Sequence, residues 1–140
     1  MSFHDIDIVA RTIYGEARGE YERKDGGLSS LIAVGNVILN RAHDRKHFGG
    51  TLSAICQKPY QFSCWLKNDP NRKLVEAANQ NDEVFRVCMD VAENLVYGRW
   101  PDLTKGSNHY HADYIKPSWA DESSFTIKIG RHVFYKLGGE

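Results

Sequence analysis

The stretch from Leu28 to Ala42 constrains the fold of this 140-residue chain more than any other. Its apolar residues recur around most of the circumference of a helix, and they are Leu28, Leu31, Ile32, Val34, Val37, Ile38 and Leu39. A helix that is apolar nearly all round has to be covered by other elements on most of its sides. The sequence therefore predicts a helix over residues 28–42 that lies in the middle of the core.

Three further helices are predicted from apolar periodicity and capping residues. Apolar residues at three- and four-residue spacing indicate a first helix over residues 3–18. Thr51 is a typical N-cap for a short helix. Asp82 is expected to cap a long helix that ends near Tyr97, just before a glycine.

The C-terminal forty residues differ in character from the helical part. Residues 107–112 and 125–135 are rich in aromatic and β-branched residues, which favours short strands, with a hairpin turn at residues 130–131. The chain has no repeat and no linker, and its length suits one domain. We therefore expect a single catalytic domain over residues 1–140 of the α+β class, with a mainly helical core and a small antiparallel β-sheet or hairpin near the C-terminus.

Charge and hydropathy narrow the possible partners. Eighteen basic residues balance eighteen acidic ones, so bulk charge gives no reason to expect a nucleic-acid partner. No segment approaches the eighteen apolar residues of a membrane span, and the N-terminus lacks the basic and apolar regions of a signal peptide. We expect no membrane insertion.

Cysteine usage indicates the compartment of synthesis. Cys56, Cys64 and Cys88 form no CxxC pair and allow at most one disulfide, which favours a reducing compartment and leaves open whether any two pair. A cysteine paired with a histidine can act as a nucleophile, but the apolar neighbours of these cysteines favour buried, unreactive thiols.

Glu16 interrupts the buried face of the first helix. It continues the apolar stripe formed by Ile6, Val9, Ala10 and Ile13. Burial of a carboxylate raises its pKa toward neutrality, so a Glu in this position can act as a general acid. The alternative interpretation is a Glu at a frayed helix end that pairs with Arg11 or Arg18.

A second carboxylate is the usual partner of such an acid in glycoside hydrolysis. Glu20 lies one helical turn after Glu16 and is the candidate, followed by Glu22 and Asp25. The alternative is that all three belong to a solvated loop.

An aromatic segment follows the short helix. It combines flat apolar rings with amide and hydroxyl groups, which is what binding of sugars requires, through Tyr60, Gln61, Phe62, Ser63 and Trp65. The alternative is an ordinary aromatic core cluster.

Three histidines in the C-terminal part offer a different chemistry. His109 and His111 alternate on one side of a predicted strand, and with His132 they can bind zinc. The tighter signatures of zinc enzymes are absent, so histidines that line a cleft or the surface are the alternative.

Several motifs in one order identify a family resemblance. They are Ile13-Tyr14-Gly15-Glu16-Ala17-Arg18-Gly19-Glu20, Ala33 to Arg41, Gln57 with Tyr60-Gln61-Phe62-Ser63, His109-Tyr110-His111-Ala112, Pro117-Ser118-Trp119-Ala120 and Ile129 to Tyr135. Together they resemble the SleB/CwlJ family of cell wall hydrolases, which includes spore cortex-lytic enzymes and phage endolysins. The resemblance covers about residues 7–136.

The resemblance implies a lysozyme-like domain that acts on peptidoglycan glycan strands without a cofactor or metal. Glu16 matches the family's catalytic acid/base. Lytic transglycosylases of this family cleave the β-1,4 bond between N-acetylmuramic acid (MurNAc) and N-acetylglucosamine (GlcNAc). The muramic C6 hydroxyl closes on C1 and leaves a 1,6-anhydro end, which removes the need for a second carboxylate. Lysozyme-type hydrolysis, with water positioned by Glu20, stays open.

The resemblance also guides the choice of cleft residues and the biological setting. We expect Gln61, Ser63, Tyr110 and His111 to supply polar groups, and Tyr60, Phe62, Trp65 and Trp119 to form the walls. The family's longer members carry signal peptides and wall-binding domains. A chain with neither is expected to be a monomeric phage endolysin, made in the host cytoplasm and reaching the cell wall after the membrane is breached.

Two rival functions remain. One is a metal-dependent amidase or peptidase that uses His109 and His111. The other is a non-catalytic module that binds the wall, since one fold can host many functions.

Overall fold

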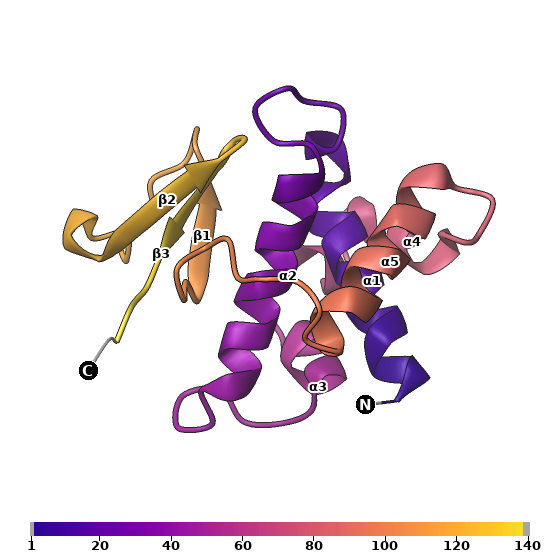
Figure 1. Ribbon diagram of the computed structural model, residues 1–140, viewed down its shortest axis with the longest axis horizontal. Coiled ribbons are helices and arrows are strands. Elements are labelled where there is room, and N and C mark those ends of the chain that lie inside the picture. The colour runs from indigo at the N-terminus through magenta and orange to yellow at the C-terminus, as the bar shows by residue number, and fades with distance from the viewer. Residues whose placement is uncertain (1, 139–140) are drawn as a thin grey trace.

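Helix α2 separates a group of helices from a small sheet in the computed structural model, which describes residues 2–138 (Figure 1). The elements in chain order are α1 (Phe3–Ala17), η1 (Arg18–Glu20), α2 (Leu28–His43), α3 (Leu52–Gln57), η2 (Ser63–Trp65), α4 (Asn71–Ala77), α5 (Glu83–Val96), β1 (His109–Ala112), η3 (Glu122–Ser124), β2 (Phe125–Ile129) and β3 (His132–Tyr135). Within residues 2–138, no helix has both the length and the hydropathy that crossing a bilayer requires.

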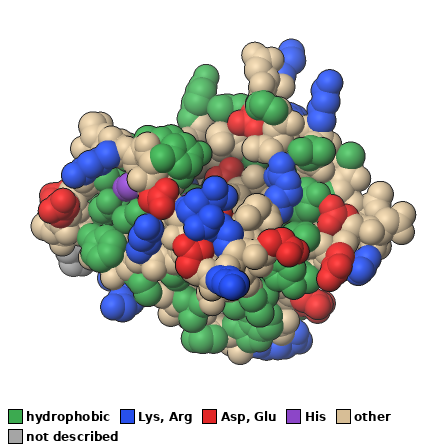
Figure 2. Space-filling model, turned by 90° about the horizontal axis from the view of Figure 1, so that it is seen from above, with side chains coloured by type: hydrophobic (Ala, Val, Ile, Leu, Met, Phe, Trp, Pro, Cys, Tyr) green, Lys and Arg blue, Asp and Glu red, His purple; other side chains and the backbone are tan. Residues whose placement is uncertain are grey.

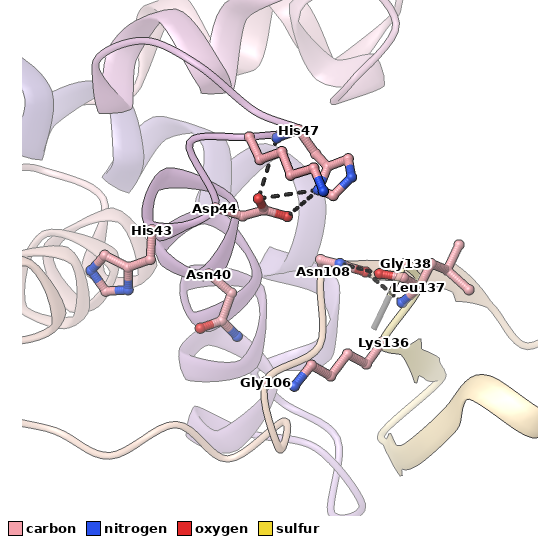
Figure 3. Close-up of a pocket in the computed structure, with 10 residues that line it drawn as sticks. Asn40, His43, Asp44, His47, Gly106, Asn108, Lys136, Leu137 and Gly138 are labelled. Carbon is pink, nitrogen blue, oxygen red and sulfur yellow. Dashed lines mark hydrogen bonds and ion pairs between the residues drawn. The ribbon is translucent and has the colours of Figure 1, made fainter. Parts of the chain in front are cut away.

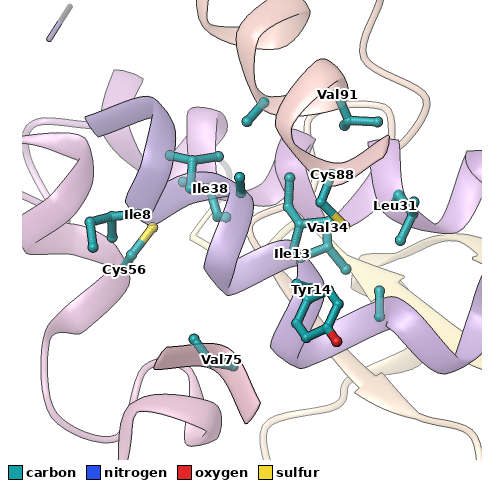
Figure 4. Packing of buried hydrophobic residues seen from close by; sticks show 14 of the residues in the cluster. Ile8, Ile13, Tyr14, Leu31, Val34, Ile38, Cys56, Val75, Cys88 and Val91 are labelled. Atoms are coloured by element: carbon teal, nitrogen blue, oxygen red, sulfur yellow. The ribbon is translucent and has the colours of Figure 1, made fainter. Parts of the chain in front are cut away.

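Helix α2 contributes to two hydrophobic cores, one on each side. The larger core lies between α1, α2 and α5, where residues such as Ile13, Val34 and Val91 are fully buried (Figure 4). The smaller core joins Ala33 and Val37 of α2 to Phe134 of β3. The predicted position of this helix in the middle of the core is therefore confirmed.

The predicted helix starts are also confirmed. The side chain of Asp82 accepts hydrogen bonds from two backbone N–H groups of the first turn of α5, and Thr51 caps α3 in the same way. Both side chains satisfy donors that the first turn of a helix leaves free. Helix α4 was not predicted, because the sequence around Pro70 indicated only a turn, and Val75 is the sole fully buried residue of that helix.

The sheet is antiparallel, with β3 in the centre and β1 and β2 at its edges. β2 and β3 form the predicted hairpin, which turns at Gly130, a residue with φ of 58°. Tyr110 of β1 lies opposite Phe134 of β3, so both side chains face α2. Alternation along the strand then directs His109 and His111 to the other face of the sheet.

Candidate active site

Glu16 lies in the last turn of α1, inside the helix and not at a frayed end. The preceding residue explains how a second segment comes close to it. A Cβ atom at Gly15 would lie 2.7 Å from the Cβ of Cys64 and 2.7 Å from a methyl group of Val75. Because only glycine fits at this distance, Gly15 allows η2 to pack directly against the end of α1.

Two hydrogen bonds hold the half-buried carboxylate of Glu16. The hydroxyl group of Tyr110 donates to Oε1 at 2.5 Å. The backbone N–H of Cys64 donates to Oε2 at 3.4 Å. The ion pairs formed within residues 2–138 do not include Glu16. The carboxylate is thus held by neutral donors.

Burial raises the pKa of Glu16 above its usual value. The hydrogen bonds from Tyr110 and Cys64 favour the charged form and offset part of this rise. Pairing with Arg11 or Arg18 does not occur, since Arg11 binds Asp7 and Arg18 donates to Asn71. A carboxyl group in this environment is suited to donate a proton near neutral pH.

The Glu16 side chain lines a pocket of about 160 Å³. The end of α1, η1, the end of β1 and the start of β3 form its walls, and Glu20, Arg131 and His132 also line it. Figure 2 shows the molecule from above, the side on which the loop between α1 and α2 projects in Figure 1. Basic and acidic side chains gather across the middle of this face.

Glu20 lies in the same pocket but in a different electrostatic environment. Its buried carboxylate accepts hydrogen bonds from the backbone N–H and the Nε of Arg131, both at 2.8 Å, and Nη2 of Arg131 lies 2.6 Å away. Burial alone would raise the pKa of Glu20, but these contacts with Arg131 hold it below its usual value. Glu20 therefore anchors the β2–β3 turn to η1.

The aromatic segment is dispersed between the core and the surface. Phe62 is buried, and the indole N–H of Trp65 donates to the hydroxyl of Thr12 at 2.9 Å. Ser63 is exposed, and Tyr60 is 84% exposed at a backbone φ of 67°. The segment thus supplies core contacts as well as exposed groups.

The predicted cleft residues of the C-terminal part lie on opposite faces of the sheet. Tyr110 reaches Glu16 on the face toward α2. His111 stacks on Tyr135 on the opposite face, with ring centroids 5.3 Å apart, and Trp119 packs edge-on against both rings. His111 and Trp119 therefore lie together, but not beside the Glu16 carboxylate.

The three histidines considered for zinc do not share one face. His132 packs on Tyr110, on the α2 side of the sheet, whereas His109 and His111 lie on the other side. The Nδ1 of His111 contacts the carbonyl oxygen of Ala112 and its Nε2 contacts the hydroxyl of Tyr135, so both ring nitrogens have protein partners. Within residues 2–138, no three His, Cys, Asp or Glu side chains are grouped as metal ligands.

Sequence reasoning missed the role of Arg41. Its buried guanidinium donates from Nε to the carbonyl oxygen of Asn108 at 2.8 Å and from Nη1 to Oε1 of Gln61 at 3.2 Å. The signal in the sequence was a charged residue at the end of an apolar helix, which requires partners. The identity of those partners depends on contacts across 67 and 20 residues.

The three cysteines are free and buried. Burial raises the pKa of Cys56 and that of Cys88 each to about 12, and it raises the pKa of Cys64 as well. Because the thiolate is the nucleophilic form, none of them is suited to nucleophilic catalysis near neutral pH. The prediction that these thiols are buried is confirmed.

Another hollow, of about 460 Å³, lies elsewhere, at the C-terminal end of α2 (Figure 3). Asn40, Asp44, His47 and Lys136 are among its lining residues. The carboxylate of Asp44 pairs with His47, and this contact lowers the pKa of Asp44. Asp44 is the only carboxylate among the described residues that line this hollow, and its lowered pKa does not suit a proton donor. The Glu16 pocket is smaller but holds a carboxyl group with a raised pKa.

Comparisons with known proteins agree with this geometry. The model of a family described as Cell Wall Hydrolase matches residues 27–135, a span that begins after Glu16. The chain is 29% identical to a spore cortex-lytic enzyme of Oceanobacillus iheyensis, over 96% of this chain and 42% of that protein. It is 25% identical to a spore cortex-lytic enzyme of Bacillus cereus, over 96% of this chain and 45% of that protein. The chain spans less than half the length of these curated relatives.

Two solved structures share the fold over nearly the whole chain. One is the catalytic domain of the germination-specific lytic transglycosylase SleB from Bacillus anthracis, with a TM-score of 0.71, 26% identity and 97% of each chain covered. The other is the catalytic domain of the Bacillus cereus SleB protein, with a TM-score of 0.68, 26% identity and coverage of 96% of this chain and 91% of that one. The predicted lysozyme-like α+β class is confirmed.

Proposed function

Because the chain belongs to the cell wall hydrolase family, we propose that residues 1–140 form one peptidoglycan-degrading catalytic domain. The proposed reaction is that of a lytic transglycosylase, which cleaves the β-1,4 bond between MurNAc and GlcNAc in glycan strands. Glu16 is the only catalytic residue in this proposal, and it serves as general acid and then as general base. The domain acts as a monomer.

The observation that carries the proposal is the state of the Glu16 carboxyl group. Its pKa is raised by burial, it lines a pocket, and its hydrogen-bond donors are neutral. In the first step the protonated group donates its proton to the glycosidic oxygen, and the bond from that oxygen to C1 of the muramic sugar breaks. The carboxylate left behind is stabilised by Tyr110 and Cys64.

The second step returns the proton. The carboxylate of Glu16 removes the proton from the C6 hydroxyl of the muramic sugar, and the C6 oxygen forms a bond to C1. The sugar ends as a 1,6-anhydro form and Glu16 is protonated again. One carboxyl group is sufficient, which agrees with the engagement of Glu20 by Arg131.

Hydrolysis by the same site is the second candidate, because Glu20 lines the same pocket as Glu16. In that reaction water attacks C1, and the product has a reducing muramic end. Mass spectrometry of muropeptides released from purified sacculi distinguishes the two reactions. A 1,6-anhydro end supports the transglycosylase, and a reducing muramic end supports hydrolysis.

An amidase or peptidase that uses His109 and His111 is a weaker candidate, because both ring nitrogens of His111 have protein partners. Such an enzyme would lose activity in the presence of a chelator and would release free stem peptides. The transglycosylase releases muropeptides with intact stems, and a chelator leaves its rate unchanged.

The proposal also concerns which kind of peptidoglycan the domain degrades, that of vegetative cells or that of the spore cortex. A phage endolysin would degrade vegetative sacculi after release from the host cytoplasm. The relatives named as spore cortex-lytic enzymes make spore cortex the other substrate to compare. Initial rates on cortex fragments and on vegetative sacculi decide between them, and faster release from cortex would reject the endolysin.

The central test replaces the proposed acid. We expect Glu16→Gln to reduce muropeptide release by at least about a hundredfold, because loss of general acid–base catalysis has this size. The matched control is Glu22→Gln, the same change at an exposed position of the loop after η1, and it should retain the wild-type rate. Circular dichroism checks that both variants are folded. Wild-type release by a folded Glu16→Gln protein would refute the proposal.

A further inference from the structure

Arg41 carries a buried positive charge that forms no ion pair within residues 2–138. Its side chain is on α2 and the residue is only 6% exposed. Its guanidinium lies over the rings of Phe62 and Phe48, at 5.0 and 5.3 Å from the centroids. Burial of a cation that lacks a partner anion is unfavourable, so its retention needs an explanation.

The hydrogen bonds of Arg41 connect it to both donors of Glu16. Arg41 binds the carbonyl oxygen of Asn108, two residues before Tyr110, whose hydroxyl donates to Oε1 of Glu16. It also binds the side chain of Gln61, three residues before Cys64, whose N–H donates to Oε2. One side chain thus links the two segments that hold the carboxylate.

We propose that Arg41 is a positioning residue for Glu16: it holds these two segments together, and its cation stabilises the ionised carboxylate. The contacts of Arg41 with Asn108 and Gln61 carry the positioning part of this inference. The electrostatic part follows from the attraction between the Arg41 and Glu16 charges. Its consequence for catalysis rests on the proposed function of Glu16. Burial favours the protonated acid, and Arg41 limits that effect so that the carboxylate can form after the first proton transfer.

The other groups around Glu16 do not supply such a cation. They are Tyr110 from β1, Cys64 from η2, Cys56 from α3, Asp69 from the segment before α4, Glu20 from η1 with its partner Arg131, and His132 from β3. Burial raises the pKa of the phenol and of both thiols, and it lowers the pKa of His132, so these four are neutral near pH 7. The charge of Arg131 is balanced by Glu20. Arg18, two residues after Glu16, also forms no ion pair within residues 2–138, but its guanidinium is engaged by Asn71 and by the carbonyl oxygens of Tyr14 and Gly15. Arg41 is therefore the buried cation near Glu16 that has no anion of its own.

The test measures the pKa of Glu16 directly and without substrate. The carboxyl carbon of ¹³C-labelled glutamate is followed by NMR as a function of pH, and the Glu16 signal is assigned by its loss in Glu16→Gln. In Arg41→Gln, which keeps an N–H donor but removes the charge, we expect the pKa of Glu16 to rise by about one unit. The sign follows because loss of a nearby cation destabilises the anion.

Arg11 provides a matched control. It also lies over an aromatic ring, 4.9 Å from the centroid of Phe85, and also donates to backbone carbonyls, but it pairs with Asp7. Arg11→Gln should leave the pKa of Glu16 unchanged. A folded Arg41→Gln protein with the wild-type Glu16 pKa would overturn the electrostatic part of the proposal.

Arg41→Lys separates the effect of the positive charge from that of the two hydrogen bonds of the guanidinium. It is also the variant to measure if Arg41→Gln does not fold. Lysine keeps the charge but not the two-armed guanidinium. We expect the pKa of Glu16 to stay close to its wild-type value, while hydrogen exchange at the Cys64 amide becomes at least about tenfold faster, because one arm of the link is lost. Unchanged exchange at this amide would reject the link. Neither readout uses activity, so an active Glu16→Gln enzyme would refute the proposed function without affecting this inference.

Discussion

Glu16 and Glu20 are the same residue type four positions apart, line one pocket, and have opposite properties. Glu16 has neutral donors, and burial raises its pKa. Glu20 has the cation Arg131, which holds its pKa below the usual value despite burial. The difference teaches that a buried carboxyl group with neutral donors keeps a raised pKa and can serve as an acid, whereas a partner cation reverses that rise and makes the carboxylate an anchor.

The backbone around the two residues matches these roles. Glu16 is on a regular helix that packs in the main core, so its position is fixed by α1. Glu20 is in the short element η1 and connects the start of the loop to the turn at Gly130 and Arg131. One carboxylate therefore belongs to the catalytic pocket, and the other holds the sheet to the helices. Three substitutions test this contrast.

The largest effect is expected for stability at Glu20. Glu20→Gln removes the negative charge while Arg131 remains, and we expect a loss of about 2.5 kcal/mol in the free energy of unfolding. Buried Glu20 loses its charge-assisted hydrogen bonds, whereas the Arg131 side chain is 45% exposed and keeps contact with water. Urea denaturation measures this loss, with Glu22→Gln as control.

The pH dependence provides the sign of the Glu20 contribution. The pKa of Glu20 is lower in the folded state than in the unfolded state, so Glu20 stabilises the fold at any pH above its unfolded-state pKa. This stabilisation is lost as the pH falls through the folded-state pKa. The stabilities of the wild type and Glu20→Gln should therefore begin to converge as the pH falls below 4.5, the usual pKa, and should meet once the pH is below the lowered folded-state pKa. Equal stability at pH 7 would show that Glu20 is not an anchor.

The next effect concerns the neutral donor of Glu16. Tyr110→Phe removes the hydroxyl group but keeps the ring that packs on His132 and Phe134. We expect the rate of muropeptide release to fall by about thirtyfold, which is the effect of one hydrogen bond to a charged group. Loss of this donor raises the pKa of Glu16 further, so the pH optimum should move upward. An unchanged rate and optimum would show that Tyr110 does not support the acid.

The smallest effect is expected for stability at Glu16. Its folded-state pKa is raised, so its contribution to stability is present below the usual value of 4.5 and is lost as the pH rises through the folded value. Glu16→Gln avoids this loss and should be about 1 kcal/mol more stable than the wild type at pH 8, as often follows removal of a catalytic group. Thermal unfolding at pH 8 and pH 4 measures the difference. If Glu16→Gln were less stable than the wild type at pH 8, Glu16 would stabilise the fold as Glu20 does, and the proposed difference between the two residues would be wrong.

Local signals in the sequence were sufficient for most of the fold. The apolar circumference of residues 28–42 predicted the central helix, and Asp82 and Thr51 marked helix starts that the structure has. These features depend on neighbours within a few residues. Helix α4 was missed because Val75 alone of its residues is fully buried, so its apolar pattern is weak.

The site was predicted in part, because its geometry depends on distant contacts. Glu16 and Tyr110 were both selected, and they form a hydrogen bond across 94 residues. Alternation correctly placed His109 and His111 on one side of the strand, but it does not say which side faces α2. Packing of Tyr110 and Phe134 against α2 decides this and directs His111 to the opposite face.

The three buried thiols determine how this domain responds to reductants and to alkylating reagents. With no cross-link joining its cysteines, folding consumes no oxidant, and a reductant has no bond to break. High pKa values also keep the sulfur atoms slow to react with alkylating reagents in the folded state. Adding or removing a reductant should therefore leave the free energy of unfolding unchanged.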